Sequence, residues 1–395
     1  MNTKLSFSPD EIETWFEEES TEAHVSVNVQ AQDPAEKYAR SQLRVIRETK
    51  DYQLDYLRHA LQSGKELIDT SPGYQRRLRW SNKKRSLLIE SFLLNIPVPP
   101  VFLFEKDYNA YEVIDGRQRI ETVRAFLCND FALSGLEYWP ELDKKRFNDL
   151  PSVLQKGLLR RSLSAVVLLA ETRAIGTDGI DVRSVLFDRL NTGGVRLNPQ
   201  ELRNALYPGE FNALLIRLAR SEPFTTTWGI PAFTKNEESE PPEELLKNPL
   251  FASLADAELV LRFFALRDAI VNSRTGSLRR ILDRYMDWKS DIGAEELREM
   301  ERQFIDTLSR LVSLFDGAPF RLPKTQRPSR PLYDALMVAL SIEPSLDIEK
   351  NASKIRSALS EALEEEDKYD VFVGRGNTID AVRQRVALAS MILKS

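Results

Sequence analysis

The sequence predicts an α+β fold, in which a small mixed sheet with helices is followed by an all-helical C-terminal domain. Residues 111–127 place strand-forming residues, an Asp-Gly turn and a helical stretch in direct succession. Residues 163–170, LSAVVLLA, form an uninterrupted apolar run with the length of a buried central strand. From about residue 251 onward, the apolar residues follow helical spacing.

The composition narrows the class of protein. The 395 residues suffice for two or three domains of about 100–200 residues each. Hydrophobic residues make up 42% and charged residues 29%, which is ordinary for a soluble globular protein. No apolar run approaches the ~18 residues of a membrane span, and the acidic N-terminus has no apolar signal core. We therefore expect a cytoplasmic protein with no membrane contact.

Cysteine, histidine and net charge argue against several kinds of site. The single cysteine, Cys128, rules out a disulfide framework within the chain and a cysteine-based zinc site. The two histidines, His24 and His59, lie outside every motif described below, which argues against histidine-metal nucleases and histidine-based triads. The net charge of −5 favours a small anion site over a broad nucleic-acid surface, without excluding DNA.

The first predicted regions are an acidic N-terminal segment, residues 1–40, and a domain that covers residues 41–232. The acidic stretch SPDEIETWFEEESTE is a short helix with Trp15 and Phe16 on one face, or a solvated tail or peripheral helix. Residues 41–63 show helical spacing, so a helix is predicted there.

Strands and helices then alternate. Residues 66–68 form a short strand, and Ser81 is a good N-cap for a helix over 82–94. The prolines of IPVPPVFLFEK end that helix, and a strand begins at about 101–105. The sequence YEVI, residues 111–114, supplies the partner strand of a hairpin-like unit.

Helical patterns dominate the rest of the chain. Residues 181–190 are helical until NTGG breaks the pattern, and Asn198, Pro199 and Glu201 form a capped start for a helix over 199–220. The polar, proline-containing stretch 233–250 is predicted as a linker, and a helical domain covers 251–395. Its predicted helices are 253–271, 278–290, 293–315, 330–343, 349–366 and 378–394.

The junction after YEVI has the features of an anion site. A glycine at position 116 permits a sharp turn and close approach of a ligand to the main chain. The helix that begins near Arg117 offers unpaired N–H groups and the positive end of its dipole. Cations at this helix end interact unfavourably with the helix dipole, but a bound anion would make their interaction favourable. Arg117 and Arg119 suit phosphate because a guanidinium group donates hydrogen bonds in pairs. Alternatively, both arginines are solvated or pair with acids such as Glu121.

Two further stretches could meet an anion. The sequence PGYQRRLRW carries Arg76, Arg77 and Arg79 between Tyr74 and Trp80, or it is a solvated edge strand. The sequence NTGGVRLNPQELRN has two glycines before a capped helix start, where main-chain N–H groups could bind an anion, or it is only a helix break with a cap.

Together these stretches resemble one family. GYQRRLRW, LLIESFLLNIPVPPVFLFE, YEVIDGRQRIETVRAFL and FDRLNTGGVRLNPQELRNALY are similar, in order and spacing, to the N-terminal domain of GmrSD-type modification-dependent restriction proteins. This is domain-of-unknown-function family 262, named for a DGQQR motif, and it is distantly similar to the ParB/sulfiredoxin fold. The resemblance covers roughly residues 65–220 and implies nucleotide binding, often with NTP hydrolysis, in anti-phage defence proteins.

The family motifs map onto single residues of this chain. DGQQR corresponds to Asp115, Gly116, Arg117, Gln118 and Arg119. Arg117 stands where the common form of the motif has glutamine, which adds a cation. The Y-Q-R motif corresponds to Tyr74, Gln75 and Arg76, and N-T-G-G corresponds to Asn191, Thr192, Gly193 and Gly194.

The resemblance implies roles for these residues. Arg119 and Arg76 would grip the phosphates of an NTP, with Tyr74, Gln75, Gly116, Arg117 and residues 191–194 also in the nucleotide site. Gln118 would orient a water or the base, which makes Asp115, Gln118 and Arg119 the predicted catalytic residues. Asp115 and Glu121 would contribute to a Mg²⁺ site, because Mg²⁺ prefers carboxylate and phosphate oxygens.

The predicted function is a nucleotide-binding, NTP-hydrolysing component of a restriction-like defence system. Many relatives carry a C-terminal HNH nuclease domain, but no histidine follows residue 59 here, so we expect none. DNA and a separate nuclease or effector chain are possible partners, and an oligomer is possible. The alternatives are a non-catalytic sensor of nucleotide or modified DNA, a ParB-like DNA endonuclease, for which no paired-acid motif is found, and a ParB-like DNA binder, which lacks a helix-turn-helix signature.

Overall fold

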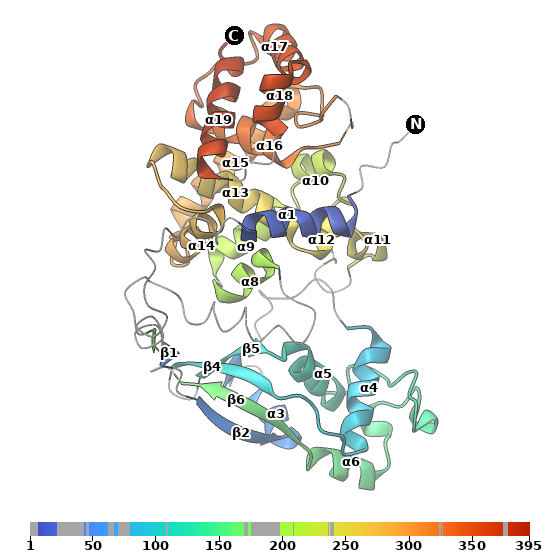
Figure 1. Ribbon diagram of the computed structural model, residues 1–395. Coiled ribbons are helices and arrows are strands. Elements are labelled where there is room, and N and C mark those ends of the chain that lie inside the picture. Colours follow the sequence, from blue (N-terminus) through green and yellow to red (C-terminus); the bar gives the residue numbers. More distant parts are fainter. Residues whose placement is uncertain are drawn as a thin grey trace. The chain divides into compact units, whose positions relative to one another are not determined.

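The chain divides into two compact units, which are described separately (Figure 1). Gln30–Leu197 form an α/β unit, and Met1–Val29 with Asn198–Ser395 form a helical unit. The computed structural model describes residues 7–21, 43–44, 47–61, 67–69, 80–107, 110–169, 173–174, 198–207, 209–235, 237, 241–323, 325, 327–373 and 378–395.

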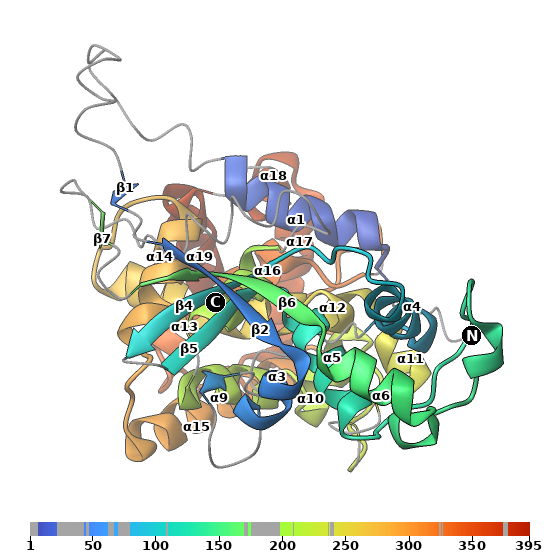
Figure 2. The ribbon, with the colours of Figure 1, turned by 90° about the horizontal axis from the view of Figure 1, so that it is seen from below.

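The α/β unit is built on a five-stranded mixed sheet with the strand order β2-β6-β4-β5-β3. Its strands are β2 (Arg47–Gln53), β3 (Ile68–Asp69), β4 (Val101–Asp107), β5 (Ala110–Asp115) and β6 (Ser162–Leu168). β6 pairs antiparallel with β2 and parallel with β4, as Figure 2 shows, whereas β5 pairs antiparallel with β4 and parallel with β3. The predicted hairpin and the mixed sheet are confirmed. A separate pair joins β1 (Leu43–Arg44) to β7 (Arg173–Ala174).

The predicted central strand is confirmed as β6, which has a neighbour on each side. Leu163, Ala165 and Val167 alternate along it and are buried in the core. The residues between them, Ser164 and Val166, are only partly buried, so β6 is central in the sheet but only one of its faces is fully buried.

The helices of this unit are α3 (Leu54–Ala60), α4 (Asn82–Leu93), α5 (Arg117–Leu127) and α6 (Ser152–Leu159), with short 3₁₀ turns at Pro140–Leu142 and Phe147–Asp149. Ser81 caps α4 as predicted, because its hydroxyl accepts a hydrogen bond from the Lys84 N–H at 3.3 Å. The apolar face of α5, with Ile120, Val123 and Phe126, packs into the same core as the sheet.

The helix predicted over residues 41–63 is wrong for its first part. Residues 47–53 form the edge strand β2, which pairs with β6 over its whole length, and helix α3 begins only at Leu54. The reason is that RETKDYQ has no apolar stripe of its own, whereas pairing with β6 satisfies its main chain. Leu54 and Leu57 do face the core from α3, so the helical spacing was real but shorter than predicted.

A buried carboxylate holds the irregular segment after α5. Glu90, on α4, is only 3% exposed and accepts hydrogen bonds from the main-chain N–H groups of Glu137, Tyr138 and Trp139 at 3.1, 2.9 and 3.0 Å. These bonds fix a segment without regular structure against the helix, because a buried carboxylate requires such donors.

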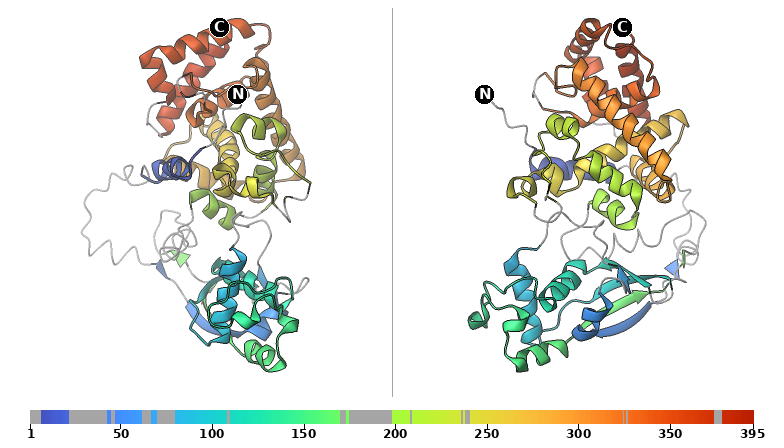
Figure 3. Two further views of the ribbon diagram at one scale, coloured as in Figure 1. Left: turned by 90° about the vertical axis from the view of Figure 1, so that its right-hand side faces the viewer. Right: turned by 180° about the vertical axis from the view of Figure 1, so that it is seen from behind.

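The helical unit is formed by thirteen described helices. They are α1 (Pro9–Thr21), α8 (Pro199–Leu206), α9 (Glu210–Leu218), α10 (Glu222–Trp228), α11 (Glu243–Leu246), α12 (Pro249–Ala252), α13 (Ala255–Val271), α14 (Leu278–Trp288), α15 (Ala294–Leu314), α16 (Arg330–Ile342), α17 (Ala352–Glu364), α18 (Glu366–Val373) and α19 (Ile379–Leu393). Helices α13 and α16 form its buried centre, and α15 (orange in Figure 3) packs on α9 and α16. The predicted helical C-terminal region is therefore confirmed. None of the described helices is both long and apolar enough to cross a membrane.

The acidic N-terminal stretch is a helix of this unit. Ile12 and Phe16 of α1 are buried, and α1 packs on α12 and α14. The Trp15 ring meets the Trp228 ring edge to face at a centroid distance of 6.3 Å. The acidic residues of α1 therefore occupy the outer side of a helix whose apolar side is packed.

The residues after Asn198 also pack with the helical unit. Asn198 forms the predicted capping box with Glu201, and its amide donates to the carbonyl of Ser253 at 2.7 Å. Helices α8 and α9 both contact α13, and Gly209 separates them within the predicted helix 199–220. The predicted boundaries at 40, 232 and 250 stay predictions, but contacts group residues 198–232 with the helices that follow. The helix predicted over 181–190 lies outside the described residues.

The predicted linker contains packed residues. Glu237 is buried and forms two hydrogen bonds with the guanidinium of Arg220, at 2.6 and 2.8 Å. Helices α11 and α12 follow directly and bury Leu245 and Leu250. In this part of the chain the polar, proline-containing composition therefore accompanies two short helices, of which α12 is capped by the Asn248 side chain.

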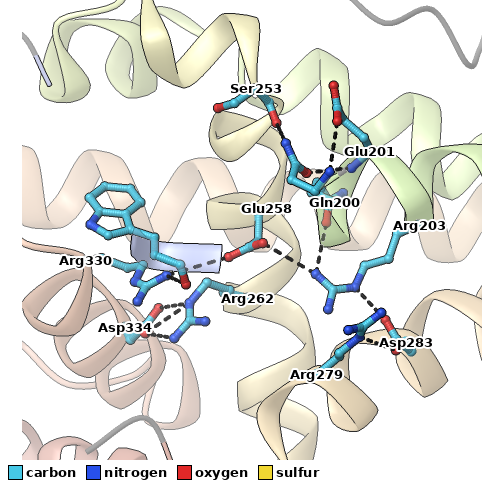
Figure 4. Close-up of polar contacts among 12 residues, drawn as sticks. Gln200, Glu201, Arg203, Ser253, Glu258, Arg262, Arg279, Asp283, Arg330 and Asp334 are labelled. Carbon is cyan, nitrogen blue, oxygen red and sulfur yellow. Dashed lines mark hydrogen bonds and ion pairs between the residues drawn. The ribbon is translucent and has the colours of Figure 1, made fainter. Parts of the chain in front are cut away.

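Ion pairs cross the interior of the helical unit (Figure 4). Arg203 of α8 contacts Glu258 of α13 at 3.4 Å and Asp283 of α14 at 2.7 Å. Arg262 of α13 pairs with Asp334 of α16, and both side chains are at most 1% exposed. Each buried charge has an opposite charge beside it, as burial in an apolar core requires.

Arg330 extends this network to the N-terminal helix. Its guanidinium donates to the carbonyl oxygen of Trp15 at 3.1 Å and to Glu18 at 3.0 Å. Burial lowers the pKa of Arg330, and its positive charge is stabilised by Glu258 and Asp334. Helix α1 is thus tied to α16 by a buried cation, in addition to its packing on α12 and α14.

Candidate functional site

The site begins at the turn between β5 and α5. Gly116 is the N-cap of α5 and has a φ of 92°, in the left-handed region that favours glycine. A Cβ atom added there would lie 2.4 Å from Cγ1 of Val101 and 2.9 Å from Nη2 of Arg119. The space beside Gly116 is therefore filled by β4 and by Arg119, so the glycine is required by packing as well as by the turn.

Arg119 is held at the first turn of α5 by two bonds from one nitrogen. Its Nη2 lies 2.7 Å from Oδ2 of Asp115 and 3.4 Å from the carbonyl oxygen of Pro100. The Arg119 side chain is 16% exposed, and its buried Nε has no hydrogen-bond partner among the described residues. Asp115, at the end of β5, thus fixes the guanidinium in one orientation.

Arg117 pairs with Glu121, which was the alternative to anion binding in the sequence analysis. Its Nε lies 2.6 Å from Oε1 of Glu121, one helical turn further along α5. Each cation at the helix start is thus offset by a carboxylate four residues away, which reduces the unfavourable interaction with the helix dipole.

Gln118 joins two of the predicted motif segments. Its Oε1 accepts a hydrogen bond from the main-chain N–H of Trp80 at 3.3 Å. Trp80 immediately precedes the N-cap of α4, and Nζ of Lys84 lies 4.8 Å from the centre of its ring. The amide oxygen predicted to orient a water or a base therefore also binds the main chain where the YQRRLRW stretch ends.

The other predicted nucleotide-binding residues lie outside the described residues. These are Tyr74, Gln75 and Arg76 of the first stretch, and Asn191, Thr192, Gly193 and Gly194 of the third. The structure brings together Asp115, Gly116, Gln118 and Arg119, with Arg117 and Glu121 on the same helix. Whether Arg76 shares a pocket with Arg119 stays a prediction.

The predicted magnesium ligands are both engaged with arginines. One oxygen of Asp115 binds Arg119, and one oxygen of Glu121 binds Arg117. In the described part of the chain, no group of three or more histidine, cysteine or acidic side chains could hold a metal ion. The 33% exposed Asp115 side chain fits an ion that takes most of its ligands from phosphate and water, as Mg²⁺ commonly does.

A separate polar cluster lies at the other end of β5. Lys50 donates a hydrogen bond to the Tyr111 hydroxyl at 3.1 Å, and this bond is the main cause of the raised pKa of Lys50. Burial raises the pKa of Tyr52 to about 12. These groups lie near the start of β5, whereas Asp115 ends it, so they are not part of the candidate site.

Two contributions to the site could not be found from residue types. The N–H of Trp80 and the carbonyl of Pro100 are main-chain atoms, which every sequence supplies. The IPVPP stretch indicated only a strand start, and nothing in its composition points to a bond with Arg119. The sequence could therefore indicate the side chains of the site but not the main-chain atoms that bind them.

A comparison with protein families connects this geometry to known proteins. Residues 57–208 match the model of the family described as GmrSD restriction endonuclease, N-terminal domain. Comparisons with curated proteins and with solved structures gave no match, so the ParB/sulfiredoxin likeness stays a prediction. The matched segment contains α4, β4, β5 and α5, and it ends just after α8. Over residues 57–208, this chain therefore matches the GmrSD N-terminal domain family.

Proposed function

We propose that the α/β unit binds a nucleoside triphosphate at the start of α5 and hydrolyses it, as part of a restriction-like defence protein. The observation that carries this proposal is the Arg119 guanidinium, which Asp115 fixes at the first turn of α5 directly after Gly116. A helix start and a fixed guanidinium both favour a phosphate group at the same place.

The orientation of Arg119 supports phosphate binding. Both of its bonds use Nη2, so within the described residues Nη1 is left to donate to a ligand. A guanidinium that is already oriented loses less conformational entropy on binding than a mobile one. Because Asp115 and Glu121 offset the two arginine charges, the attraction for an anion depends on N–H groups that point at it rather than on net charge.

The magnesium ion of a bound Mg-NTP would be held by Asp115 together with phosphate oxygens, and it would neutralise phosphate charge. The protein residues orient the nucleotide around it. Arg119 holds a phosphate oxygen, and the tight Gly116 turn fixes Arg119 relative to β5.

The family description supports the biological setting, because it names a restriction endonuclease. In this proposal, the α/β unit senses or consumes the nucleotide, and DNA or a separate nuclease chain is the partner of the whole protein. We propose no nuclease site within the described residues, where no metal-binding group of three is found.

Calorimetry tests the proposal with each of the four NTPs in the presence of Mg²⁺. Saturable binding is expected for the wild type, with strong loss in Arg119→Ala, and phosphate release measures hydrolysis. Absence of binding to all four nucleotides would contradict the proposal. DNA nicking by the purified chain that is abolished in Asp115→Ala would instead favour the endonuclease alternative.

A second candidate function is a sensor that binds the nucleotide without turnover. The observation that favours it is that the predicted catalytic groups are already engaged, Asp115 with Arg119 and Gln118 with the Trp80 main chain. The two functions differ in one measurement. A sensor shows no phosphate release above background at a saturating NTP concentration, whereas an NTPase does.

A further inference from the structure

We propose that the protein forms a homodimer through its edge strand β2, which pairs antiparallel with β2 of a second copy in a register centred on Thr49. The pairing joins the mixed sheets of the two copies into one continuous sheet. This inference goes beyond the proposed nucleotide binding and does not depend on it.

Strand β2 forms an open edge among the described residues. It is the last strand in the order β2-β6-β4-β5-β3, and its pairing partner there is β6. The strand has seven residues, and the exposed ones include Arg47, Thr49, Asp51 and Gln53. An edge of this kind presents a row of N–H and C=O groups, which favours the addition of another strand.

The pairing with β6 determines which main-chain groups of β2 point outward. The N–H of Leu54 donates to the carbonyl of Arg161 at 2.8 Å, which continues the register between β2 and β6. The N–H and C=O groups of successive residues point to opposite sides of a strand, so those of even-numbered residues in β2 point to β6. Those of residues 47, 49, 51 and 53 point away from it. A second copy can therefore bond only to odd-numbered residues.

Charge selects one register among those that remain. In a pairing centred on Thr49, Arg47 lies opposite Asp51 of the second copy, and Glu48 lies opposite Lys50. Two-fold symmetry makes each of these opposite-charge pairs occur twice. A pairing centred on any of the four charged residues instead places two like charges opposite each other, which is destabilising. Pairings centred beyond Asp51 leave most of the strand unpaired.

The same register also forms the main-chain bonds. Thr49 faces its counterpart, and Arg47 faces Asp51, with outward groups on both sides, which gives about six N–H···O=C hydrogen bonds. Glu48 and Lys50 form the intervening pairs without hydrogen bonds, in which opposite side chains are closest. Charged side chains on an edge strand normally deter pairing. Here they deter every register except the one in which a second copy complements them.

The contacts within one copy are compatible with this pairing. Glu48 lies 3.4 Å from its own Lys50, and its side chain is 52% exposed, so it can bridge the lysines of both copies. Asp51 accepts a hydrogen bond from the Ser164 hydroxyl through Oδ1, and its Oδ2 can accept from Arg47 of the second copy. Dimer formation therefore requires no bond within the sheet to be broken.

The first experiment tests the edge. Sedimentation of the full chain without nucleotide, over a series of concentrations, gives the dimer Kd. Thr49→Pro removes an outward N–H and spares the bonds to β6, because proline is tolerated on an edge strand at such a position. Thr49→Val is the control, because it keeps the N–H. We expect Thr49→Pro to raise Kd about tenfold or more relative to Thr49→Val, with thermal unfolding confirming that both variants fold.

The second experiment tests the register by exchanging charges. Arg47→Glu and Asp51→Arg should each raise the dimer Kd about tenfold, because each places like charges opposite each other twice. The double variant should restore dimer formation. Residues 47 and 51 lie about 13 Å apart along one strand, so this restoration requires a contact between copies.

The third experiment is disulfide cross-linking in a Cys128→Ser background, which removes the exposed native cysteine. With Thr49→Cys, the two Cα atoms at position 49 lie about 5.5 Å apart in this register, within the range of a disulfide bond. With Gln53→Cys, they lie about 27 Å apart. Mild oxidation should therefore link the copies of Thr49→Cys and not those of Gln53→Cys.

The inference is supported if Thr49→Pro weakens the dimer, the charge exchange restores it, and only Thr49→Cys is cross-linked. It is overturned if the wild type stays monomeric at every concentration, if the double charge variant fails to restore the dimer, or if Gln53→Cys is linked as readily as Thr49→Cys. If Thr49→Pro fails to fold, the charge and cysteine variants still decide. None of these measurements uses a nucleotide, so failure of the proposed function is detected separately.

Discussion

The two units of this protein use the same chemistry, arginine paired with a carboxylate, in different surroundings. At the start of α5, the paired Arg119 and Asp115 side chains are 16% and 33% exposed. Between α13 and α16, the paired Arg262 and Asp334 side chains are 1% and 0% exposed. A partly exposed pair can exchange a bond for a ligand or for water, whereas a buried pair cannot be opened without leaving a charge in the core. The exposure of the pair, rather than its residue types, separates a candidate binding site from a structural contact.

The strongest test of this comparison is to break the buried pair. Asp334→Ala leaves the buried guanidinium of Arg262 without its carboxylate and should lower the free energy of unfolding by about 3–5 kcal/mol, measured by urea denaturation. Asp380→Ala is the control, because Asp380 is 80% exposed and pairs with Arg383 on the surface, so its loss should cost less than about 1 kcal/mol. Similar losses in both variants would contradict the comparison.

The turn of the candidate site gives the next largest effect. Gly116→Ala should destabilise the protein by about 2–4 kcal/mol, because alanine is strained at this φ and its Cβ would collide with Val101. Thermal and urea unfolding measure this loss. Gly157→Ala should stabilise by about 0.5–1 kcal/mol, because Gly157 lies within α6 and an added Cβ meets nothing within 4 Å. A tolerated Gly116→Ala would show that β4 can move away from α5.

Arg119→Ala tests whether the exposed pair serves ligand binding rather than the stability of the fold. It should raise the Kd for Mg-NTP about 10- to 100-fold, because a charge-assisted hydrogen bond is lost, as measured by calorimetry. The free energy of unfolding should fall by less than about 1 kcal/mol, since the pair with Asp115 is partly exposed. Arg124→Ala, an exposed position on the same helix, should change neither quantity. A loss of stability as large as that of Asp334→Ala would make Arg119 a structural residue.

The smallest expected effect concerns alkaline pH. Burial raises the pKa of Tyr52 from 10.0 to about 12, so the folded state keeps its proton longer than the unfolded state does. The contribution of Tyr52 to stability is therefore complete below pH 10 and is lost as the pH rises toward 12. Tyr52→Phe should make urea unfolding less dependent on pH in this range. Tyr138→Phe, at a residue that is 70% exposed, is the control and should leave the pH dependence unchanged.

The sequence predicted those helix caps, strands and turns that depend on residues close together in the chain. The caps of α4 and α8 were visible because Ser81 and Asn198 bond to residues three positions ahead of them. The hydrophobic run of β6 was visible because alternate residues of this central strand, Leu163, Ala165 and Val167, are buried in the core. The turn at Gly116 was visible because an Asp-Gly pair followed a strand and preceded a helix.

Distant contacts account for what the sequence did not reveal. Strand β2 looked helical because its last residues run into α3, and its pairing partner lies more than a hundred residues away in β6. The grouping of α8 with the helical unit depends on Arg203 meeting Glu258 and Asp283. At the site, the pairing of Arg117 with Glu121 was one of the alternatives, but the bond between Gln118 and the Trp80 main chain has no residue signature.

The place of α1 in the chain also affects how the protein is made. Helix α1 ends at Thr21 and its partner α12 begins at Pro249, so 249 − 21 = 228 positions separate them. At a synthesis rate of about 5–20 residues per second, the ribosome needs roughly 10–45 s to supply that partner. During this interval the nascent helix has to keep Ile12 and Phe16 exposed or shielded by a chaperone, while the whole α/β unit is synthesised.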